Sequence, residues 1–167
     1  LFSQQGGKQL TFDCNSGIDH LTVNAGRNHF NDATITVQAS GKATDIKQFD
    51  LTNCKLEVAQ KNQTLLAVSG SGTYDKASEA ADMQVVTKAV LAPLFQAIPH
   101  PADTSVTAGT VDLTARFTQK QKAQAVTGTL ALANLSGRLG TNELCNLGSG
   151  VDFDVGMASQ QVQIRKL

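Results

Sequence analysis

The chain has 167 residues, enough for one domain, and its 14 basic and 14 acidic side chains give a formal net charge of zero. Because no basic excess is available to neutralise phosphates, general nucleic-acid binding is disfavoured, and there is no polybasic run for an anionic membrane surface. Hydrophobic residues make up 41% of the chain but aromatic residues only 5%, and the apolar set is mostly Ala, Val and Leu. Together with abundant Thr, this composition favours extended sheet over a helical domain.

Alternating apolar and polar residues predict strands through the first half of the chain, because successive side chains of a strand point to opposite faces. We expect turns at Asn15–Gly17 and Ser40–Lys42 and a bulge near Thr52–Asn53, where the alternation changes phase. Gly70 and Gly72 would weaken the fifth strand or let another backbone approach it closely. The alternating runs lie at 10–14, 21–25, 33–39, 46–58, 66–74 and 81–85.

One segment, Thr87–Ile98, has apolar residues at helical spacing. Thr87 is expected to cap its N-terminus, and Pro99-His100-Pro101 to end it. Pro93 lies inside the segment and would kink the helix or confine it to the residues that follow. We expect this short, one-sidedly apolar helix to plug one end of a sheet. A membrane-lying anchor is the weaker alternative, because the segment carries only Lys88 and no Trp.

The longest alternating stretch, residues 106–139, predicts a hairpin of two long strands. Its arms, at 111–117 and 126–132, flank a polar loop at 119–124. Each arm should run about seven to ten residues, or roughly 23–33 Å. Further runs at 151–155 and 162–164 bring the expected total to about ten strands against one helix. Because the connections are short, neighbouring strands should be antiparallel, and the expected fold class is mainly β.

Three cysteines, Cys14, Cys54 and Cys145, leave at least one thiol unpaired in a monomer. We expect core-facing thiols that behave as small hydrophobic residues, with a Cys14–Cys54 bridge left open. Metal chelation is less expected, because the sequence has no CxxC pair.

Enzyme motifs are lacking in this sequence. His20, His29 and His100 are isolated from one another and from any nucleophile, metal or acid–base motif. Asp152 and Asp154 share one strand face two residues apart, a pattern typical of a solvated face rather than a catalytic pair. We therefore expect no enzyme activity, no metal and no cofactor.

The informative feature is a continuous aliphatic face on many strands, with one short helix to cover it. Two arrangements remain open: a closed barrel or sandwich whose apolar faces meet, or an open groove that holds hydrocarbon. Burying an acyl chain in such a groove would return about 0.8 kcal/mol per CH₂. The groove-lining residues would include Ile35, Val37, Leu56, Val58, Val111, Leu113, Phe117, Leu130, Leu132, Val151 and Phe153.

Residues 66–155 carry a recognisable order of elements: a Gly-bearing strand at Val68–Tyr74, a short apolar helix at Leu91–Ile98, a long strand preceded by Gly at Ala108–Ala115, and a second long strand ending at Leu135–Leu139. This order resembles the AsmA-like and TamB-like repeating β-groove proteins of Gram-negative envelopes, over about the last two thirds of the chain. The resemblance implies a long, taco-like curled sheet with an apolar concave face and no catalytic residues. It also implies a periplasm-spanning parent protein, held by an inner-membrane helix that this sequence lacks.

The chain opens and ends in strand-like sequence, so we expect residues 1–167 to be a single β-rich domain excised from a longer chain. The expected function is that of a lipid-shielding segment that supports lipid transport or outer-membrane assembly, with acyl chains and an outer-membrane assembly protein as partners. The alternative is a β-rich adhesion or structural module of a cell-surface protein, which would bind protein or glycan at its loops.

Overall fold

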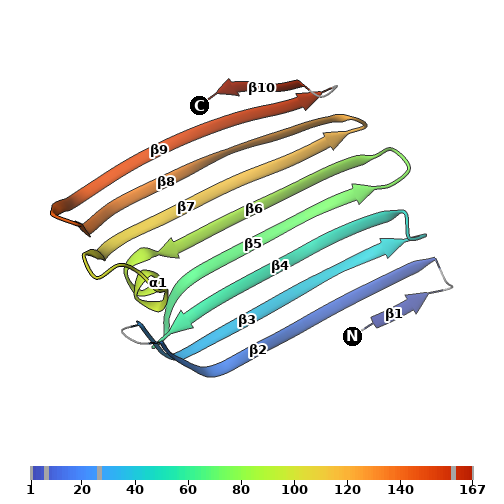
Figure 1. Ribbon diagram of the computed structural model, residues 1–167. Coiled ribbons are helices and arrows are strands. Elements are labelled where there is room, and N and C mark those ends of the chain that lie inside the picture. The colour runs from blue at the N-terminus through green and yellow to red at the C-terminus, as the bar shows by residue number, and fades with distance from the viewer. Residues whose placement is uncertain (1, 6–7, 26–27, 159–160, 167) are drawn as a thin grey trace.

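The computed structural model describes the backbone of residues 2–5, 8–25, 28–158 and 161–166, and the side chains of residues 8–23, 31–158 and 161–166. The described residues form ten strands and one helix, and every strand pairs antiparallel with the next one along the chain (Figure 1). The strands are β1 (Phe2–Gln5), β2 (Gln9–Ala25), β3 (Asn28–Thr44), β4 (Gln48–Gln60), β5 (Gln63–Asp75), β6 (Ala80–Val90), β7 (Thr104–Lys120), β8 (Ala123–Leu139), β9 (Asn142–Ala158) and β10 (Gln161–Lys166), with helix α1 (Leu91–Ala97) between β6 and β7.

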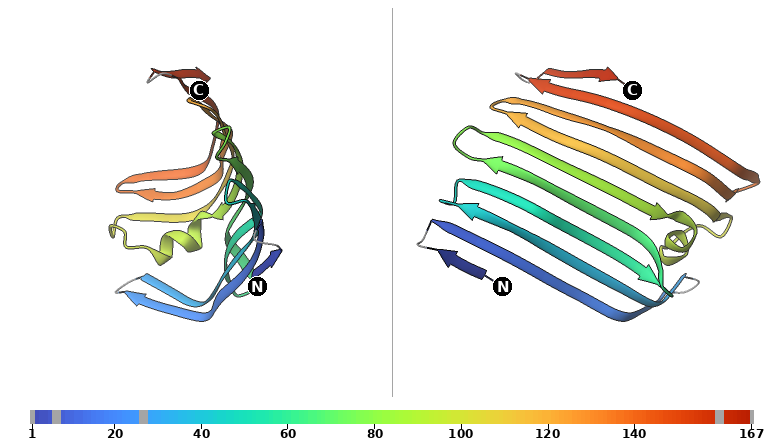
Figure 2. Two further views of the ribbon diagram at one scale, coloured as in Figure 1. Left: turned by 90° about the vertical axis from the view of Figure 1, so that its right-hand side faces the viewer. Right: turned by 180° about the vertical axis from the view of Figure 1, so that it is seen from behind.

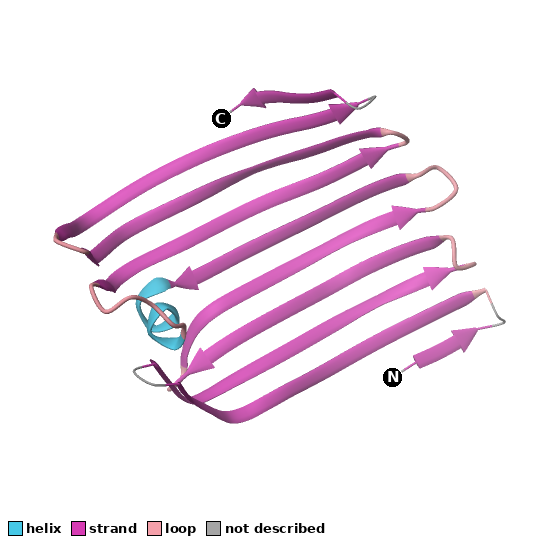
Figure 3. Cartoon of the chain, in the orientation of Figure 1, coloured by secondary structure: helices cyan, strands magenta, loops and turns pink. Residues whose placement is uncertain are grey.

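The sheet is open, because β1 and β10 lie at its two opposite edges (Figure 3). The predicted fold class, a mainly β antiparallel sheet with one short helix, is confirmed. The alternative of a closed barrel or a two-layer sandwich is wrong for the described strands.

The pairing register divides the sheet into an apolar face and a polar face, because residues opposite one another in adjacent strands share a face. Leu113 of β7 pairs with Leu130 of β8, which pairs with Val151 of β9. The neighbouring residues Thr114 and Thr129 pair on the other face. Three ion pairs also lie on that polar face: Arg116 with Asp82, Arg165 with Asp154, and Lys166 with Asp152.

The strands bend at the end of the sheet that carries α1, and they curl towards the side on which the helix lies (Figure 2). His20 and Asp32, on β2 and β3, have φ of 57° and 55°, and Asn134 and Asn146, on β8 and β9, have φ of 54° and 52°. The ladders shift register beside these residues. An extra residue in one strand bends that strand locally, so aligned bulges account for the curl.

Helix α1 is shorter than predicted, because residues 87–90 stay in β6, where Thr87 pairs with Leu113 of β7. Thr87 is therefore not the N-cap; Val90 takes that position without a side-chain cap hydrogen bond. Pro93 lies in the first turn of the helix, where its missing N–H would have had no helical partner. The prediction that a short helix plugs one end of the sheet is confirmed (Figure 2).

Two predicted turns are absent, and the strands are much longer than expected. Asn15–Gly17 lies inside β2, and Ser40–Lys42 lies inside β3, where residues 14–17 of β2 pair with residues 36–39 of β3. The arms of the predicted hairpin, β7 and β8, each run 17 residues instead of about ten. The predicted bulge near Thr52–Asn53 is confirmed by a register shift between Leu51 and Cys54.

Candidate functional site

All eleven predicted lining residues lie on the apolar face of the sheet. On β3 and β4 they form two directly opposed pairs, and on β7, β8 and β9 they form a second, larger group. Strands β5 and β6 separate the two groups. The first group is Ile35, Val37, Leu56 and Val58, and the second is Val111, Leu113, Phe117, Leu130, Leu132, Val151 and Phe153.

The apolar face is largely open to solvent. Val37, Leu130 and Val151 are 40%, 41% and 39% exposed, and the other eight predicted lining residues are half-buried. Among the described side chains, the hydrophobic residues that are buried are Ala33, Ala43, Leu65 and Ala81. The strands from β2 to β9 run about 36–56 Å, and the face is about 34 Å wide across them. An exposed apolar surface of this extent is unusual for a monomeric protein in water and marks a site of interaction.

Helix α1 covers this face at the bent end only. Its residues Leu94 and Ala97 pack with Leu21 and Val58 against the buried pair Ala33 and Leu65. The helix also lies close to β7 at Gly109, which has a φ of +140°. A Cβ at Gly109 would stand 3.1 Å from Leu91 Cδ1 and 3.3 Å from Leu135 Cα, so the helix needs a glycine beneath it.

A trough of about 250 Å³ runs along the apolar face over Gly70 and Gly72 of β5. The two glycines occupy successive positions on this face and contribute no side chain between β4 and β6, although Met83 of β6 lies close to Gly72. Leu56 of β4 lines one side of the trough, and Val85 of β6 lines the other.

The sequence led us to expect that these glycines weaken β5 or let another backbone approach closely. The close approach is confirmed, because a Cβ at Gly72 would stand 2.7 Å from the Asp82 carbonyl oxygen and 2.9 Å from Met83 Cα. The trough was not predicted, and the pairing of apolar strands on either side was the signal for it.

One end of the trough is marked by two aromatic rings. Phe49 of β4 and Tyr74 of β5 are opposite one another, and their rings stack with centroids 6.3 Å apart. The turn before β4, at residues 45–47, and the turn after β5, at residues 76–79, both lie at the end of the sheet opposite α1 (Figure 1).

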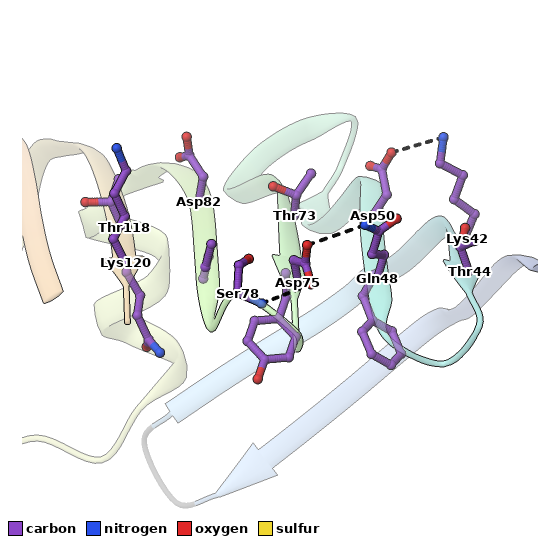
Figure 4. Close-up of a pocket in the computed structure, with 15 residues that line it drawn as sticks. Lys42, Thr44, Gln48, Asp50, Thr73, Asp75, Ser78, Asp82, Thr118 and Lys120 are labelled. Atoms are coloured by element: carbon purple, nitrogen blue, oxygen red, sulfur yellow. Dashed lines mark hydrogen bonds and ion pairs between the residues drawn. The ribbon is translucent and has the colours of Figure 1, made fainter. Parts of the chain in front are cut away.

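A second cavity, of about 490 Å³, is polar and lies across β3 to β7 at that same end (Figure 4). Its carboxylates already have partners. Asp50 lies 3.4 Å from Lys42 Nζ, and Asp82 pairs with Arg116. Asp75 accepts a hydrogen bond of 2.8 Å from the backbone N–H of Ala77.

The partners of Asp75 and Asp82 favour the ionised form of these two carboxyl groups. The backbone N–H of Ala77 holds the pKa of Asp75 below its usual value, and the hydrogen bond from Arg116 does the same for the pKa of Asp82. A general acid at neutral pH needs a raised pKa, which is the opposite shift. The pKa values of Asp75 and Asp82 are therefore shifted away from the direction that a general acid requires.

The histidines do not assemble a site among the described side chains. His20 Nδ1 lies 2.6 Å from Asp32 Oδ1 at the bend, and this hydrogen bond raises the pKa of His20. His100 stacks on Phe95 with ring centroids 4.5 Å apart. The side chain of His29 lies outside the described residues. No group of three or more potential metal ligands occurs in the described part of the chain.

The cysteine prediction is wrong in one respect: all three thiols are free and exposed rather than core-facing. Cys14 and Cys54 lie on the apolar face, but each pairs with Ala39 from opposite sides, on β2 and β4. Two strand spacings separate their backbones by about 9.6 Å, beyond the roughly 7 Å that a disulfide can span. No bridge between them fits this register.

Among the described helices, none is long and apolar enough to cross a membrane. Comparison with known protein families, curated proteins and solved structures finds no match for this chain. The assignment to AsmA-like and TamB-like proteins therefore stays a prediction, and the function must be argued from the site itself.

Proposed function

We propose that the curled sheet shields the acyl chains of lipids on its concave apolar face. The chain would serve as a lipid-handling segment of a periplasm-spanning envelope protein, anchored in the inner membrane, that supports lipid transport or outer-membrane assembly. The observation that carries this proposal is an apolar face of eight long strands that the protein itself covers only where α1 packs.

The side chains of the apolar face favour hydrocarbon as the material that covers it. Its lining residues are aliphatic or aromatic, and the charged side chains of the paired strands lie on the opposite face. Such a surface offers an acyl chain about 0.8 kcal/mol for each CH₂ that leaves water. With few polar groups to hold a particular head group, it suits conveyance of lipids better than selective recognition.

Three of the turns are short, which favours the groove over a module that binds through its loops. Lys61–Asn62, Gln121–Lys122 and Gly140–Thr141 are two-residue turns between neighbouring strands. Binding loops are ordinarily longer than the two-residue connection of a hairpin. These connections present little surface beyond the strand ends.

Lipid that co-purifies with the chain from a Gram-negative envelope provides the test. We expect native mass spectrometry to detect bound lipid, and Leu113→Asn or Leu132→Asn to reduce its yield severalfold, because an amide would be buried against hydrocarbon. Thr114→Asn is the matched control: this residue adjoins Leu113 in β7 but faces the polar side, so its lipid yield should be unchanged.

Equal lipid yields for Leu113→Asn and Thr114→Asn would contradict the proposal, and so would a lipid-free dimer that buries the apolar face between two copies. Circular dichroism of each variant establishes that a lost lipid signal does not come from unfolding.

A further inference from the structure

Resting on the proposed function, we propose that the trough over Gly70 and Gly72 seats the hydrocarbon chain of an anionic amphiphile, whose head group lies at the adjacent turns carrying Lys47 and Lys76. The ligand class is thus a carboxylate- or phosphate-headed acyl chain, oriented with its tail towards α1. This goes beyond shielding of lipids in general, because it assigns a binding site for the acyl chain, the direction in which the chain lies and the charge of the head group.

The shape of the trough fits one extended chain rather than a whole folded ligand. Its volume, about 250 Å³, lies just under the range of about 300–1,000 Å³ that is typical of sites for drug-sized molecules. Its axis follows β5, since the missing side chains are those of Gly70 and Gly72, two residues apart on one strand. Ridges of side chains on β4 and β6, including Leu56, Met83 and Val85, would hold the chain on both sides.

The lining of the trough excludes a charge inside it. No charged side chain contributes to its walls; the polar residues there, such as Ser71 and Thr73, alternate with the glycines and Tyr74 and so face the opposite side of the sheet. A head group must therefore lie outside the trough, beyond one of its ends.

The charge at the aromatic end of the trough is positive and unpaired. Lys47 and Lys76 stand in the two turns just beyond Phe49 and Tyr74, and the backbone N–H of Lys76 donates to the carbonyl of Lys47 at 2.8 Å. Neither lysine takes part in an ion pair with any side chain that the structure describes. The two lysines thus lie on adjoining turns, and each ammonium can donate hydrogen bonds to an anionic head group.

The same end of the sheet has a surplus of lysine that the other end lacks. Lys8, Lys120 and Lys122 join Lys47 and Lys76 in the described turns and strand ends there, against the acidic residues Asp45 and Glu79 in the same turns. Asp75, the nearest strand carboxylate, is held by the N–H groups of Ala77 and Ser78. At the α1 end, the described connections carry Lys61 against Asp103. This polarity selects a negative head group and sets the direction of the tail.

Two of the exposed cysteines can report whether a ligand occupies the trough. Cys54 lines the trough, and Cys14 lies on the same apolar face two strands away. A ligand in the trough should slow maleimide labelling of Cys54 while leaving Cys14 reactive, and peptide mass spectrometry distinguishes the two thiols. Dodecanoate, dodecyl maltoside and dodecyltrimethylammonium, each below its critical micelle concentration, vary the head-group charge on one chain length.

We expect dodecanoate to protect Cys54 at the lowest concentration and the cationic amphiphile at the highest, with the difference shrinking as salt is added. Lys47→Gln combined with Lys76→Gln should weaken dodecanoate binding by about threefold to tenfold and leave dodecyl maltoside unchanged. Lys61→Gln, in a turn at the α1 end, is the matched control and should change neither.

A substitution that fills part of the trough tests whether the acyl chain binds there. A Cβ at Gly70 would stand 3.0 Å from the Gln84 carbonyl oxygen and 3.7 Å from Val85 Cγ2, so Gly70→Ala requires the β6 backbone at Gln84 to move by a few tenths of an ångström, and circular dichroism must show that the variant stays folded. This substitution should weaken the binding of all three amphiphiles by about fourfold, which is the equivalent of one CH₂ group displaced from the trough. Gly150→Ala, which adds a methyl to open space on β9, should have no effect.

The outcomes separate this inference from the proposed function. Equal protection of Cys54 by all three amphiphiles, unaffected by the lysine substitutions, would overturn the inference and leave lipid shielding standing. Co-purified lipid without protection of Cys54 would place the chains elsewhere on the face and overturn the seat. Protection of Cys54 and Cys14 together, with a dimer by light scattering and no lipid, would overturn both proposals in favour of a second copy.

Discussion

The two ends of the sheet differ in whether the protein covers its own apolar face. At the α1 end, bulges curl the strands around a helix, and Ala33 and Leu65 are 0% and 2% exposed. Towards the opposite end the strands are interrupted by the bulge near Thr52–Asn53 but carry no covering helix, and Phe49 and Met83 are 41% and 44% exposed on the same face. One face with one alternating pattern thus becomes a core where a second element is present and an open surface where none is.

The largest effect should come from the helix-covered end. Leu65→Ala removes a side chain buried beneath α1 and should lower the free energy of unfolding by about 2–5 kcal/mol. Leu130→Ala, on the open face, should cost well under about 2 kcal/mol, because that side chain is already partly in water. Urea denaturation measures both, and similar losses would mean that the open face is covered in solution.

A smaller loss is expected where the helix meets β7. Gly109→Ala places a Cβ against Leu91 at a φ of +140°, and should cost about 1–3 kcal/mol of stability. Gly150→Ala, in the open region of β9, should stay within about 0.5 kcal/mol of the parent. Equal stabilities of the two variants would show that α1 is not held tightly against the sheet.

The smallest effect concerns the bend itself, at His20 and Asp32. The hydrogen bond from Asp32 raises the pKa of His20 above its ordinary 6.5, so the folded protein binds this proton more tightly than the unfolded chain does. The resulting stabilisation is fully present below pH 6.5 and is lost as the pH rises through the raised pKa. NMR titration of the His20 ring should show this raised pKa.

Asp32→Asn removes the carboxylate and should return the His20 pKa towards its ordinary value. The same variant should also flatten the dependence of stability on pH in this window. An unchanged titration would mean that the two side chains do not meet in solution.

Several features were predictable because they depend on local pattern. The alternation through residues 111–117 and 126–132 placed their apolar side chains on one face, and the structure pairs them there. The phase change near Thr52–Asn53 marked a bulge, and the spacing around Leu94 marked a helix. Each of these signals needs only the neighbouring residues of the chain.

Other features could not be predicted because they depend on strands that are distant in sequence. Asn15–Gly17 has turn composition, yet pairing with β3 keeps it extended, since a ladder of hydrogen bonds outweighs a local preference. The helix lost its first four predicted residues to pairing between β6 and β7. The trough exists only because the register sets Gly70 and Gly72 between the apolar residues of β4 and β6.

The sequence by itself determined the mainly β class, the position of the short helix and the side of each strand that is apolar, because a period of two assigns faces without reference to the rest of the fold. Only the tertiary structure decided that the sheet stays open, that it curls around α1 and that its thiols are exposed. The reason is physical: alternation states which face avoids water, whereas the number of layers determines whether protein is present to cover it.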